Sequence, residues 1–421
     1  MTSILLPIPN VPYPLVAGGH LRDWQILHIL NRMGIKPHVL YFKAGEGYDL
    51  SPENPVQRLA ASLAFAGARL ENPDKSPWAR AKRKIGYLFG VEQYYPFSYQ
   101  YDAINANKII LEHAKKVKAD IVILRSFWCH YIPILQKEGF KIIVNCLDYN
   151  TRLAIEMIGS VKNPLRKIGP LCNYIGIRRQ ERTFLPLCDE LWIPTKSEFE
   201  EMTKVVLKGK MVIFPNLIDV KSYPDFSEKD VEKFSILFVA NFDYLPNANA
   251  ANNLLKNIFP GVKRRFPSAK LYLIGKGLPV PLQELALKTG GIEVPGFVKD
   301  LKEYFEKAAV FVSPVNEGAG MLFKVLEALS YGKPVVGFKK SFRGITDANG
   351  QGFFAVDSVE EFINKIVALM VSDEKRNLLA HNARKIAEQE LSFEKGRSIL
   401  ERSIVNINRC MSDNKLINDK L

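Results

Sequence analysis

Short segments that are almost entirely apolar alternate with longer segments of helical periodicity along the whole chain. Strands that are apolar throughout are typical of parallel sheets covered by helices on both faces. Two such series, each about half of the chain, predict an α/β fold with two Rossmann-like, doubly wound parallel-sheet domains and not one barrel. The expected strands are Ser3–Leu6, His38–Phe42, Asp120–Leu124, Lys141–Cys146, Glu190–Ile193, Met211–Phe214, Ser235–Ala240, Lys270–Ile274, Val310–Ser313 and Pro334–Phe338.

The first series ends in the segment Pro215–Tyr223, where we place the boundary between the two domains. The predicted domains are residues 1–215 and 216–392, and a helix and tail at 393–421 cross back to the first domain. Open α/β sheets bind ligands at the carboxyl ends of their strands. We therefore expect the functional site in a cleft between the domains.

The charge balance indicates an anionic partner. Lys and Arg number 58 against 44 Asp and Glu, a net charge of +14, which suits nucleic acid, a membrane surface or a phosphorylated small molecule. The five cysteines are scattered and form no C-x-x-C pair, so we expect free thiols in a reducing cytosol. Prolines interrupt the uncharged N-terminal run, which argues against a secretory signal. The sequence has no run of 18 apolar residues, and we expect no membrane span.

The most informative stretch runs from Val310 to Leu329, where a buried strand, a glycine-containing turn and a helix follow one another. Backbone amides at such a helix start are unpaired and lie at the positive end of the helix dipole, so they can hold a diphosphate. Lys324 and Glu327 are three residues apart and share a face, and the carboxylate can accept both hydroxyls of a ribose. A plain strand–loop–helix connection with a surface Lys–Glu pair explains the spacing equally well.

Two further glycine turns follow expected strands. Gly18-Gly19, with Arg22 in the next helix, allows close approach of a ligand to the backbone, although tight packing alone also explains such a turn. Gly275-Lys276-Gly277 lacks the third glycine of a dinucleotide-binding motif. Lys276 is either a phosphate or base contact or a solvated loop lysine.

These segments together resemble the C-terminal domain of GT-B glycosyltransferases of family 4, the group 1 type that builds bacterial polysaccharides and glycolipids. The matching pieces occur in the family's order and are Phe238–Asn247, Ala269–Gly277, Val294–Val298 and Glu317–Val336. The first half is similar more loosely, at Gly18-Gly19, Cys188-Asp189 and Pro215–Asp219. The resemblance implies two facing Rossmann-like domains and sugar transfer from a nucleotide-sugar donor with retention of configuration.

The resemblance also implies roles for individual residues. Glu327 corresponds to the second glutamate of the family's E-x7-E element, which hydrogen-bonds the donor ribose. Lys324 corresponds to a basic residue that contacts phosphate, and the backbone of Phe297 and Val298 lies where the nucleobase edge is usually bound. The turn residues whose amides would meet the diphosphate and the sugar are Gly318, Gly320, Met321 and Leu322.

The sequence departs from the family at two places. Ala319 stands where the first glutamate of E-x7-E is expected, and Glu317, two residues earlier, is our candidate for its catalytic role. Asn241 and Asp243 stand where many members carry Arg and Lys, so the diphosphate loses two charge-assisted hydrogen bonds. We retain Asn241 as a donor-binding candidate. The positive charge would then have to come from Lys276, Lys324 and Arg22.

Two first-domain residues are further catalytic candidates. Family members often carry a histidine after the strand corresponding to Asp120–Leu124; here His130 is the candidate, although a lone histidine among apolar neighbours is more often structural. Asp148 either binds acceptor hydroxyls or forms an Asx turn. Asn247 is expected to cap the helix that follows Pro246, outside the site.

The segment 75–101 combines basic and aromatic residues. Five of the ten residues from Lys75 to Lys84 are basic, and tyrosines and phenylalanines follow up to Tyr101. This composition suits peripheral contact with an anionic membrane and would also suit single-stranded nucleic acid. A solvated loop above an aromatic cluster is the simpler alternative.

We therefore expect a retaining hexosyl-type glycosyltransferase (EC 2.4) of cell-envelope polysaccharide biosynthesis, cytoplasmic or on the inner face of the cytoplasmic membrane. Its substrates would be a nucleoside-diphosphate sugar and a glycan or lipid-linked acceptor, without nucleic acid. The sequence has no Asp-x-Asp motif and the fold usually needs no metal, so we expect neither metal nor cofactor. Two alternatives stay open. A nucleotide-sugar epimerase would form product without acceptor, and a decayed membrane- or nucleic-acid-binding protein would bind no nucleotide sugar.

Overall fold

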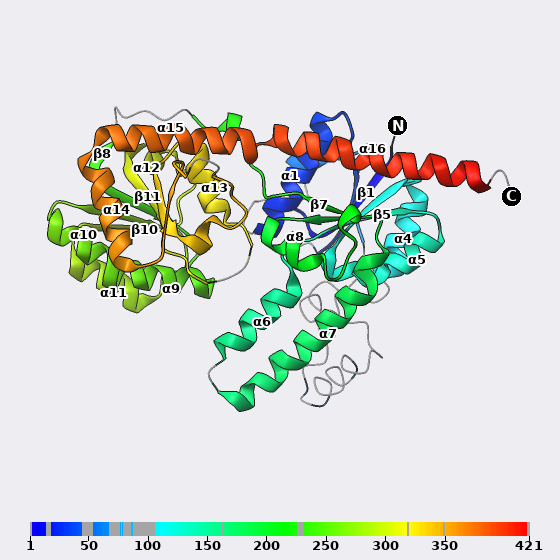
Figure 1. Cartoon of the computed structure of the whole chain (residues 1–421), viewed down its shortest axis with the longest axis horizontal. Coiled ribbons are helices and arrows are strands. Elements are labelled where there is room, and N and C mark those ends of the chain that lie inside the picture. The colour runs from blue at the N-terminus through cyan, green and yellow to red at the C-terminus, as the bar shows by residue number, and fades with distance from the viewer. Residues whose placement is uncertain are drawn as a thin grey trace. The chain divides into compact units, whose positions relative to one another are not determined.

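The computed structural model describes residues 2–13, 18–43, 54–66, 106–161, 163–224, 231–317, 320–347 and 350–418, with the single positions 76, 78 and 86. The chain forms two compact units (Figure 1). Unit 1 consists of residues 1–215 and 396–421, and unit 2 consists of residues 216–395. Each unit is a parallel sheet with helices packed on it, so the predicted α/β fold class is confirmed.

Unit 1 contains a sheet with seven strands among the described residues, all paired in parallel, in the order β3-β2-β1-β4-β5-β6-β7. The chain runs outward from β1 to β3 and then returns to place β4 on the other side of β1. This reversal makes the β1–β4 junction the topological switch point, where open α/β sheets bind ligands. The strands are β1 (Ile4–Asn10), β2 (His38–Lys43), β3 (Ser62–Phe65), β4 (Ile121–Arg125), β5 (Lys141–Asn145), β6 (Glu190–Ile193) and β7 (Met211–Ile213).

Carboxylates fix the starts of two unit 1 helices. Thr195, the N-cap of α8, accepts a hydrogen bond from the amide of Glu198 (3.2 Å) and donates one to its carboxylate (2.8 Å). Glu181 of α7 accepts from the hydroxyl (2.5 Å) and the amide (3.3 Å) of Thr151 in the first turn of α6. The helices are α1 (Gly18–Arg32), α2 (Pro55–Leu59), α4 (Ala106–Lys116), η1 (Ser126–Tyr131), α5 (Ile132–Lys137), α6 (Asn150–Ser160), α7 (Ile168–Phe184) and α8 (Lys196–Met202).

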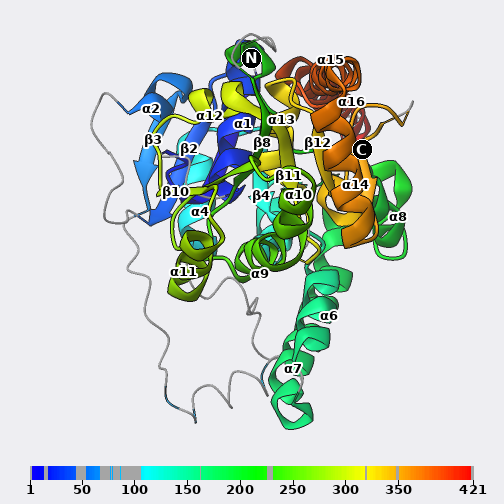
Figure 2. The same ribbon diagram turned by 90° about the vertical axis from the view of Figure 1, so that its left-hand side faces the viewer.

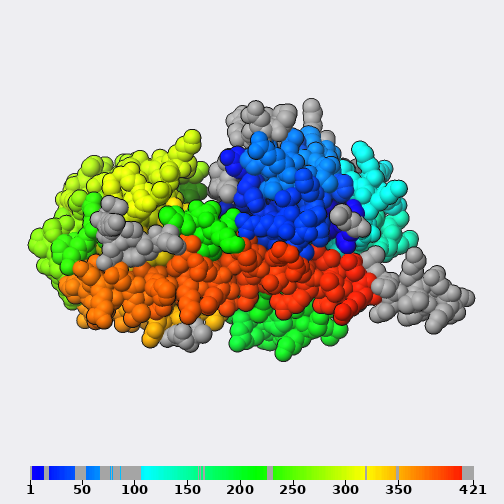
Figure 3. All heavy atoms as spheres, turned by 90° about the horizontal axis from the view of Figure 1, so that it is seen from above, coloured from blue at the N-terminus to red at the C-terminus, as the bar shows by residue number. Residues whose placement is uncertain are grey.

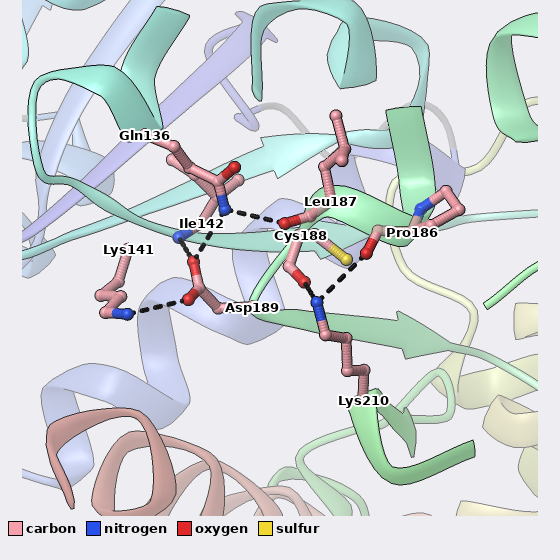
Figure 4. Close-up of polar contacts among 8 residues, drawn as sticks. All are labelled: Gln136, Lys141, Ile142, Pro186, Leu187, Cys188, Asp189 and Lys210. Carbon is pink, nitrogen blue, oxygen red and sulfur yellow. Dashed lines mark hydrogen bonds and ion pairs between the residues drawn. The ribbon is translucent and has the colours of Figure 1, made fainter. Parts of the chain in front are cut away.

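Asp189 and Lys210 fasten the entry into β6 (Figure 4). The carboxylate of Asp189 accepts from the amide of Ile142 (2.9 Å) and the ammonium of Lys141 (3.0 Å). Lys210 donates to the carbonyl of Cys188 (2.9 Å). Burial raises the pKa of the Cys188 thiol to about 12. These contacts lie at the amino ends of β5 and β6, the edge opposite to the switch point, so Cys188-Asp189 stabilises the sheet.

Unit 2 contains a sheet with six parallel strands within the described part of the chain, in the order β10-β9-β8-β11-β12-β13. Its switch point is the β8–β11 junction. Because successive side chains of a strand point to opposite faces, Ile236 and Phe238 pack in one core cluster and Leu237 packs in another. The strands are β8 (Glu232–Val239), β9 (Lys270–Ile274), β10 (Ile292–Gly296), β11 (Ala308–Ser313), β12 (Val335–Phe338) and β13 (Phe354–Val356).

Helices cover both faces of the unit 2 sheet. Residues of α9, α10 and α11 pack in one core cluster, and residues of α12, α13 and α15 pack in the other. In Figure 1, α15 lies along the top of the unit, and α9 and α11 lie at its bottom. The segments are α9 (Leu245–Asn253), the π-helical turn η6 (Leu254–Ile258), α10 (Phe259–Arg265), α11 (Val280–Thr289), α12 (Lys302–Lys307), α13 (Phe323–Ser330), α14 (Val359–Val371) and α15 (Asp373–Glu390).

The last helix, α16 (Phe393–Asn418), begins in unit 2 and joins unit 1 from Gly396 onward. Figure 3 shows this part, in red, beside the blue N-terminal segments of unit 1. Asn408 donates a hydrogen bond to the hydroxyl of Thr2 (3.2 Å). The side chain of Ser403 in this helix is buried. The helix is therefore part of the unit 1 structure.

Among the strands that the structure describes, β3, β10 and β13 were not predicted from the sequence. Each lies at an edge of its sheet. β10 alternates partly buried with exposed residues and contains Pro295, so it lacks the continuous apolar run of the central strands.

Candidate functional site

The β8–β11 junction of unit 2 brings together several of the predicted site residues. The loop after β8 contains Asn241 and leads into α9. The loop after β11 contains Glu317 and leads through Met321 into α13. Because parallel strands end at the same edge of a sheet, these two loops flank the switch point.

The first backbone amides of α13 lie at this junction, before the helix's own i to i−4 hydrogen bonds begin. Leu322 precedes the helix in an extended conformation, and its side chain makes no capping hydrogen bond. The buried Met321 fixes the approach to the helix, because its carbonyl accepts from the side-chain amide of Asn216 (3.3 Å). Gly320 adopts a φ of 79°, in the left-handed region that favours glycine. An anion at this helix start would meet free amides and the positive end of the dipole.

Lys324, in the first turn of α13, has an uncompensated ammonium. Its Nζ donates to Oδ1 of Asn247 (2.6 Å) and lies 5.1 Å from the ring centre of Phe238. Burial lowers the pKa of Lys324 to about 7, and among the residues that the structure describes no carboxylate acts to raise it. A buried cation without a negative partner favours binding of an anion.

Glu327 follows one turn later on the same helix. Burial raises the pKa of its carboxyl to about 7. The charge of Glu327 contributes to raising the pKa of Tyr223 and of Tyr331, whose rings pack edge to face at 4.9 Å. A carboxylate in such a site is desolvated and would gain from hydroxyl donors of a ligand.

Helix α9 is tied to both ends of the β11–α13 segment, which the sequence did not reveal. Asn247 was expected to cap its helix, but the N-cap position is Tyr244 and the Asn247 side chain instead links the carbonyl of Asn241 (2.8 Å) to Lys324. Asn249 donates to the exposed carboxylate of Glu317 (3.0 Å). The expectation for Asn247 was therefore wrong, and this residue belongs to the candidate site.

The glycines of the Gly275-Lys276-Gly277 turn are explained by packing. Gly275 has a φ of 139°, and a Cβ there would lie 1.6 Å from the carbonyl oxygen of Ala240; a Cβ on Gly277 would lie 2.0 Å from Oδ1 of Asp243. The Lys276 side chain is more than half exposed and its Nζ lies 3.7 Å from Asp243. The turn thus holds the loop after β8 in place and carries Lys276 at the same sheet edge.

The remaining donor-side candidates lie at this edge or outside the described residues. Phe297 and Val298 follow β10; the Phe297 side chain is 74% exposed, while Val298 packs against the core. Gly318, like the departure at Ala319, falls outside the residues that the structure describes.

The β1–β4 junction of unit 1 contains a buried ion pair. Arg125, the last residue of β4, donates through Nη2 to Asp23 of α1 and to the carbonyl of Gly19, both at 2.9 Å. Both side chains of the pair are almost completely buried. Gly18 and Gly19 begin α1, so the predicted glycine turn sits beside a cation that already has a carboxylate.

Arg22 is completely buried within unit 1. Its guanidinium donates to Oδ1 of Asn145 (3.0 Å) and to the carbonyls of Phe214 (2.8 Å) and Pro215 (2.5 Å), and it stacks on the Phe214 ring. Burial, with a smaller contribution from Arg125, lowers the pKa of Arg22 to about 9. Arg22 thus fastens the last residues of unit 1 to the sheet and presents no exposed surface to a phosphate.

The two unit 1 catalytic candidates differ in environment. His130 lies in η1 against the rings of Tyr131 and Phe184. Burial lowers the pKa of its imidazole to about 4, so it is neutral at pH 7. Asp148, between β5 and α6, is partly exposed, and its charge partly offsets the fall in the pKa of Arg22.

The segment 75–101, predicted to contact membranes, lies outside the described residues except for three positions. One of these, Trp78, is 81% exposed. Within the described ranges, no helix combines the length and apolar character needed to cross a bilayer.

Comparison with known proteins bears on unit 2 first. Residues 233–372 match the family described as Glycosyl transferases group 1. The matched region runs from β8 to α14 and contains the whole β8–β11 junction. The resemblance seen in the sequence is therefore confirmed for this region. A comparison with curated proteins gives no match.

Solved structures similar to the whole chain include three glycosyltransferase-type proteins. Sucrose-phosphate synthase from Thermosynechococcus elongatus has a TM-score of 0.69 at 13% identity, covering 97% of this chain and 100% of that one. Anabaena HepE in complex with UDP has a TM-score of 0.64 at 12% identity, covering 96% of this chain and 100% of that one. WaaG, a glycosyltransferase involved in lipopolysaccharide biosynthesis, has a TM-score of 0.61 at 14% identity, covering 96% of this chain and 99% of that one. At these identities the likeness establishes the fold, which is that of GT-B glycosyltransferases.

Proposed function

We propose that this chain, which carries a Glycosyl transferases group 1 region on a GT-B fold, transfers a sugar from a nucleoside-diphosphate sugar to a hydroxyl of a glycan or lipid-linked acceptor. One observation carries the proposal. At the switch point of unit 2, the ammonium of Lys324 lies at a helix start with an amide oxygen, and not a carboxylate, as its hydrogen-bond partner. A diphosphate supplies the missing negative charge.

Each group at this site has a role in the proposed reaction. The free amides at the start of α13 and the ammonium of Lys324 bind the diphosphate and stabilise the charge that develops as it leaves the sugar. Glu327 accepts hydrogen bonds from the ribose hydroxyls. The backbone of Phe297 and Val298 binds the base. Glu317 lies at the sugar end of the same loop.

The oxygen of an acceptor hydroxyl then bonds to the anomeric carbon as the bond from that carbon to the diphosphate oxygen breaks. The hydroxyl proton passes to the leaving diphosphate, and the configuration at the anomeric carbon is retained. In unit 1, Asp148 is the proposed contact for acceptor hydroxyls. His130 and Arg22 have no part in the proposal. Burial keeps the His130 imidazole neutral, and the Arg22 guanidinium already donates to the backbone carbonyls of Phe214 and Pro215.

The likeness to Anabaena HepE, solved with UDP, supports a uridine donor, and the likeness to WaaG supports an acceptor of the cell envelope. No divalent cation enters the proposed reaction. We predict that excess chelator leaves the rate of sugar transfer unchanged. A rate that falls with chelator and recovers with Mg²⁺ or Mn²⁺ would remove this part of the proposal.

Thermal unfolding with a panel of nucleoside diphosphates and their sugars tests the proposal. A ligand at 100 times its dissociation constant stabilises a protein by about 2.7 kcal/mol. We expect one nucleotide family to stabilise the wild type and Glu327→Ala to lose most of this response. Glu284→Ala, which removes an exposed glutamate of α11, is the matched control and should respond like wild type.

Two outcomes contradict the proposal. If no nucleotide stabilises the wild type, unit 2 lacks a donor site and the transferase function fails. If sugar is released or altered without any acceptor and no transfer occurs with one, the chemistry is epimerisation or hydrolysis. The anomeric configuration of an isolated product, measured by NMR couplings, separately tests retention.

A further inference from the structure

Helices α6 and α7 form a hairpin that stands away from the sheet of unit 1, as both views show (Figures 1 and 2). The helices pack along each other, and their base is held by Ala154, Ile177 and Phe127 in one small apolar cluster. The bonds from Thr151 to Glu181 fix the same base. The outer part of the hairpin is thus carried on a fixed base without itself belonging to the main core of the unit.

The outer part exposes large apolar side chains. Exposed fractions range from 39% to 62% for five residues within 21 positions of the sequence. A surface helix normally turns its apolar residues inward, and a cluster of exposed ones marks an interaction surface. The five residues are Ile155, Met157, Ile168, Leu171 and Ile175.

The exposed side of α7 has two chemically different halves. Ile168, Leu171 and Ile175 occupy the half that leads from the tip, and three exposed arginines occupy the half nearer the sheet. At 3.6 residues per turn all six positions fall within an arc of about 100°. The arginines are Arg178, Arg179 and Arg182.

The charge of the hairpin is one-sided. The sequence from 150 to 184 contains seven basic residues and two acidic ones. One of the two acidic residues, Glu181, is buried at the base, and burial raises the pKa of its carboxyl to about 7. The hairpin therefore exposes both apolar side chains and Arg166 near its tip, and a row of arginines on the half of α7 nearer the sheet.

We infer that the α6–α7 hairpin docks on an anionic lipid surface. The apolar side chains near the tip enter the boundary between headgroups and acyl chains, and the arginine row of α7 meets the lipid phosphates. The length of α7, 17 residues or about 25 Å, separates the apolar tip from the sheet. Complementary charge favours lipid over a neutral protein partner. The inference uses no residue of unit 2, so it is independent of the proposed donor site.

Sedimentation of the full-length protein with vesicles tests this inference. We expect binding to vesicles of phosphatidylglycerol and phosphatidylcholine in equal amounts, with weaker binding to phosphatidylcholine alone and a decrease as salt increases. The combined variant Ile168→Ser, Leu171→Ser and Ile175→Ser should lower the partition coefficient about tenfold or more. The matched control removes three exposed apolar residues of unit 2 and should bind like wild type: Val280→Ser, Leu287→Ser and Leu378→Ser.

The arginine row has its own pair of variants. Arg178→Ser with Arg182→Ser should weaken binding to anionic vesicles about tenfold and flatten its salt dependence. Lys256→Ser with Arg264→Ser removes the same charge from exposed positions of unit 2 and should have a much smaller effect. Circular dichroism and thermal unfolding verify that each variant is folded, and single Ile168→Ser and Ile175→Ser substitutions replace the triple if it is not.

Three results would overturn the inference. The first is equal loss of vesicle binding in the hairpin variants and their unit 2 controls. The second is wild-type binding in the triple variant. The third is a protein that ignores vesicles but self-associates in analytical ultracentrifugation, with the hairpin triple monomeric, because the apolar face would then bind a second copy of the chain.

Discussion

Unit 1 and unit 2 each place a cation at the topological switch point of their sheet, with different partners. In unit 1, Arg125 is paired with the carboxylate of Asp23 and with the carbonyl of Gly19. In unit 2, Lys324 meets the amide oxygen of Asn247 and the face of Phe238. The first cation is neutralised within the protein and joins a strand to a helix. The second has no partner carboxylate among the described residues, so an external anion would stabilise its charged form.

The largest effect is expected from breaking the ion pair between Arg125 and Asp23 at the β1–β4 junction of unit 1. Arg125→Met leaves the Asp23 carboxylate buried without its cation, and should lower the free energy of unfolding by about 3–5 kcal/mol. Urea denaturation measures this change. The double variant Arg125→Met with Asp23→Leu removes both charges and should recover much of the loss. If the single variant is as stable as wild type, the ion pair does not hold the junction together.

The uncompensated junction should respond in the opposite way. Lys324→Met removes a charge that burial disfavours, so stability without ligand should be unchanged or higher. Nucleoside diphosphate affinity should fall about 10- to 100-fold, because a charge-assisted bond to phosphate is lost. Calorimetric titration measures the affinity, and Lys276→Met, at an exposed lysine with a nearby carboxylate, is the comparison. Equal losses of nucleoside diphosphate affinity in the two variants would contradict a specific role for Lys324 in binding the diphosphate.

The smallest expected effect is a pH dependence at the same site. The pKa of Glu327 in the folded protein, about 7, is above the ordinary value of 4.5, so the folded state binds more protons between these pH values. Its contribution to stability is therefore present below about pH 4.5 and lost as the pH rises through 7. Glu327→Gln should gain about 1–3 kcal/mol relative to wild type from about pH 5 to pH 8.

The pH dependence of stability that Lys324 contributes should have the opposite sign to that of Glu327. The folded-state pKa of Lys324, about 7, is below the ordinary 10.5, so the unfolded state binds more protons above pH 7 and wild-type stability rises there. Any advantage of Lys324→Met over wild type should shrink from about pH 7 to pH 10. A Glu327→Gln stability profile that runs parallel to wild type from about pH 4.5 to pH 7 would contradict the shift at Glu327. A Lys324→Met profile that runs parallel to wild type from about pH 7 to pH 10 would contradict the shift at Lys324.

The central strands could be predicted because burial on both faces leaves a direct mark on the sequence. β11, with all six residues buried, is apolar except for Ser313. The edge strands β3 and β10 expose residues and leave no such run. Helix α6 leaves no clear mark on the local sequence, for another reason. Its start is satisfied by Glu181, about 30 residues later in the sequence, and no local signal announces a partner at that distance.

The candidate site was predictable where it depends on local spacing. The strand–turn–helix pattern placed Lys324 and Glu327 on α13. It could not show that Asn247 reaches Lys324 across 77 residues, because an asparagine after a proline is locally an ordinary capping candidate. For Arg22 the error was the opposite one, because the sequence suggested a donor-binding residue and the structure shows a residue bonded within unit 1. The carbonyls that occupy it belong to Phe214 and Pro215, almost 200 residues away, and only the folded chain reveals them.

The late position of α16 in the sequence has a consequence for biosynthesis. The helix leaves the ribosome only after all of unit 2. Its buried residues are Ile399, Leu400, Ile404 and Ile407, and its Asn408 donates a hydrogen bond to Thr2 at the start of the chain. Synthesis at about 5–20 residues per second therefore leaves the nascent N-terminal unit waiting for its last helix for tens of seconds. During that interval the apolar surface of unit 1 that these α16 residues later bury stays uncovered.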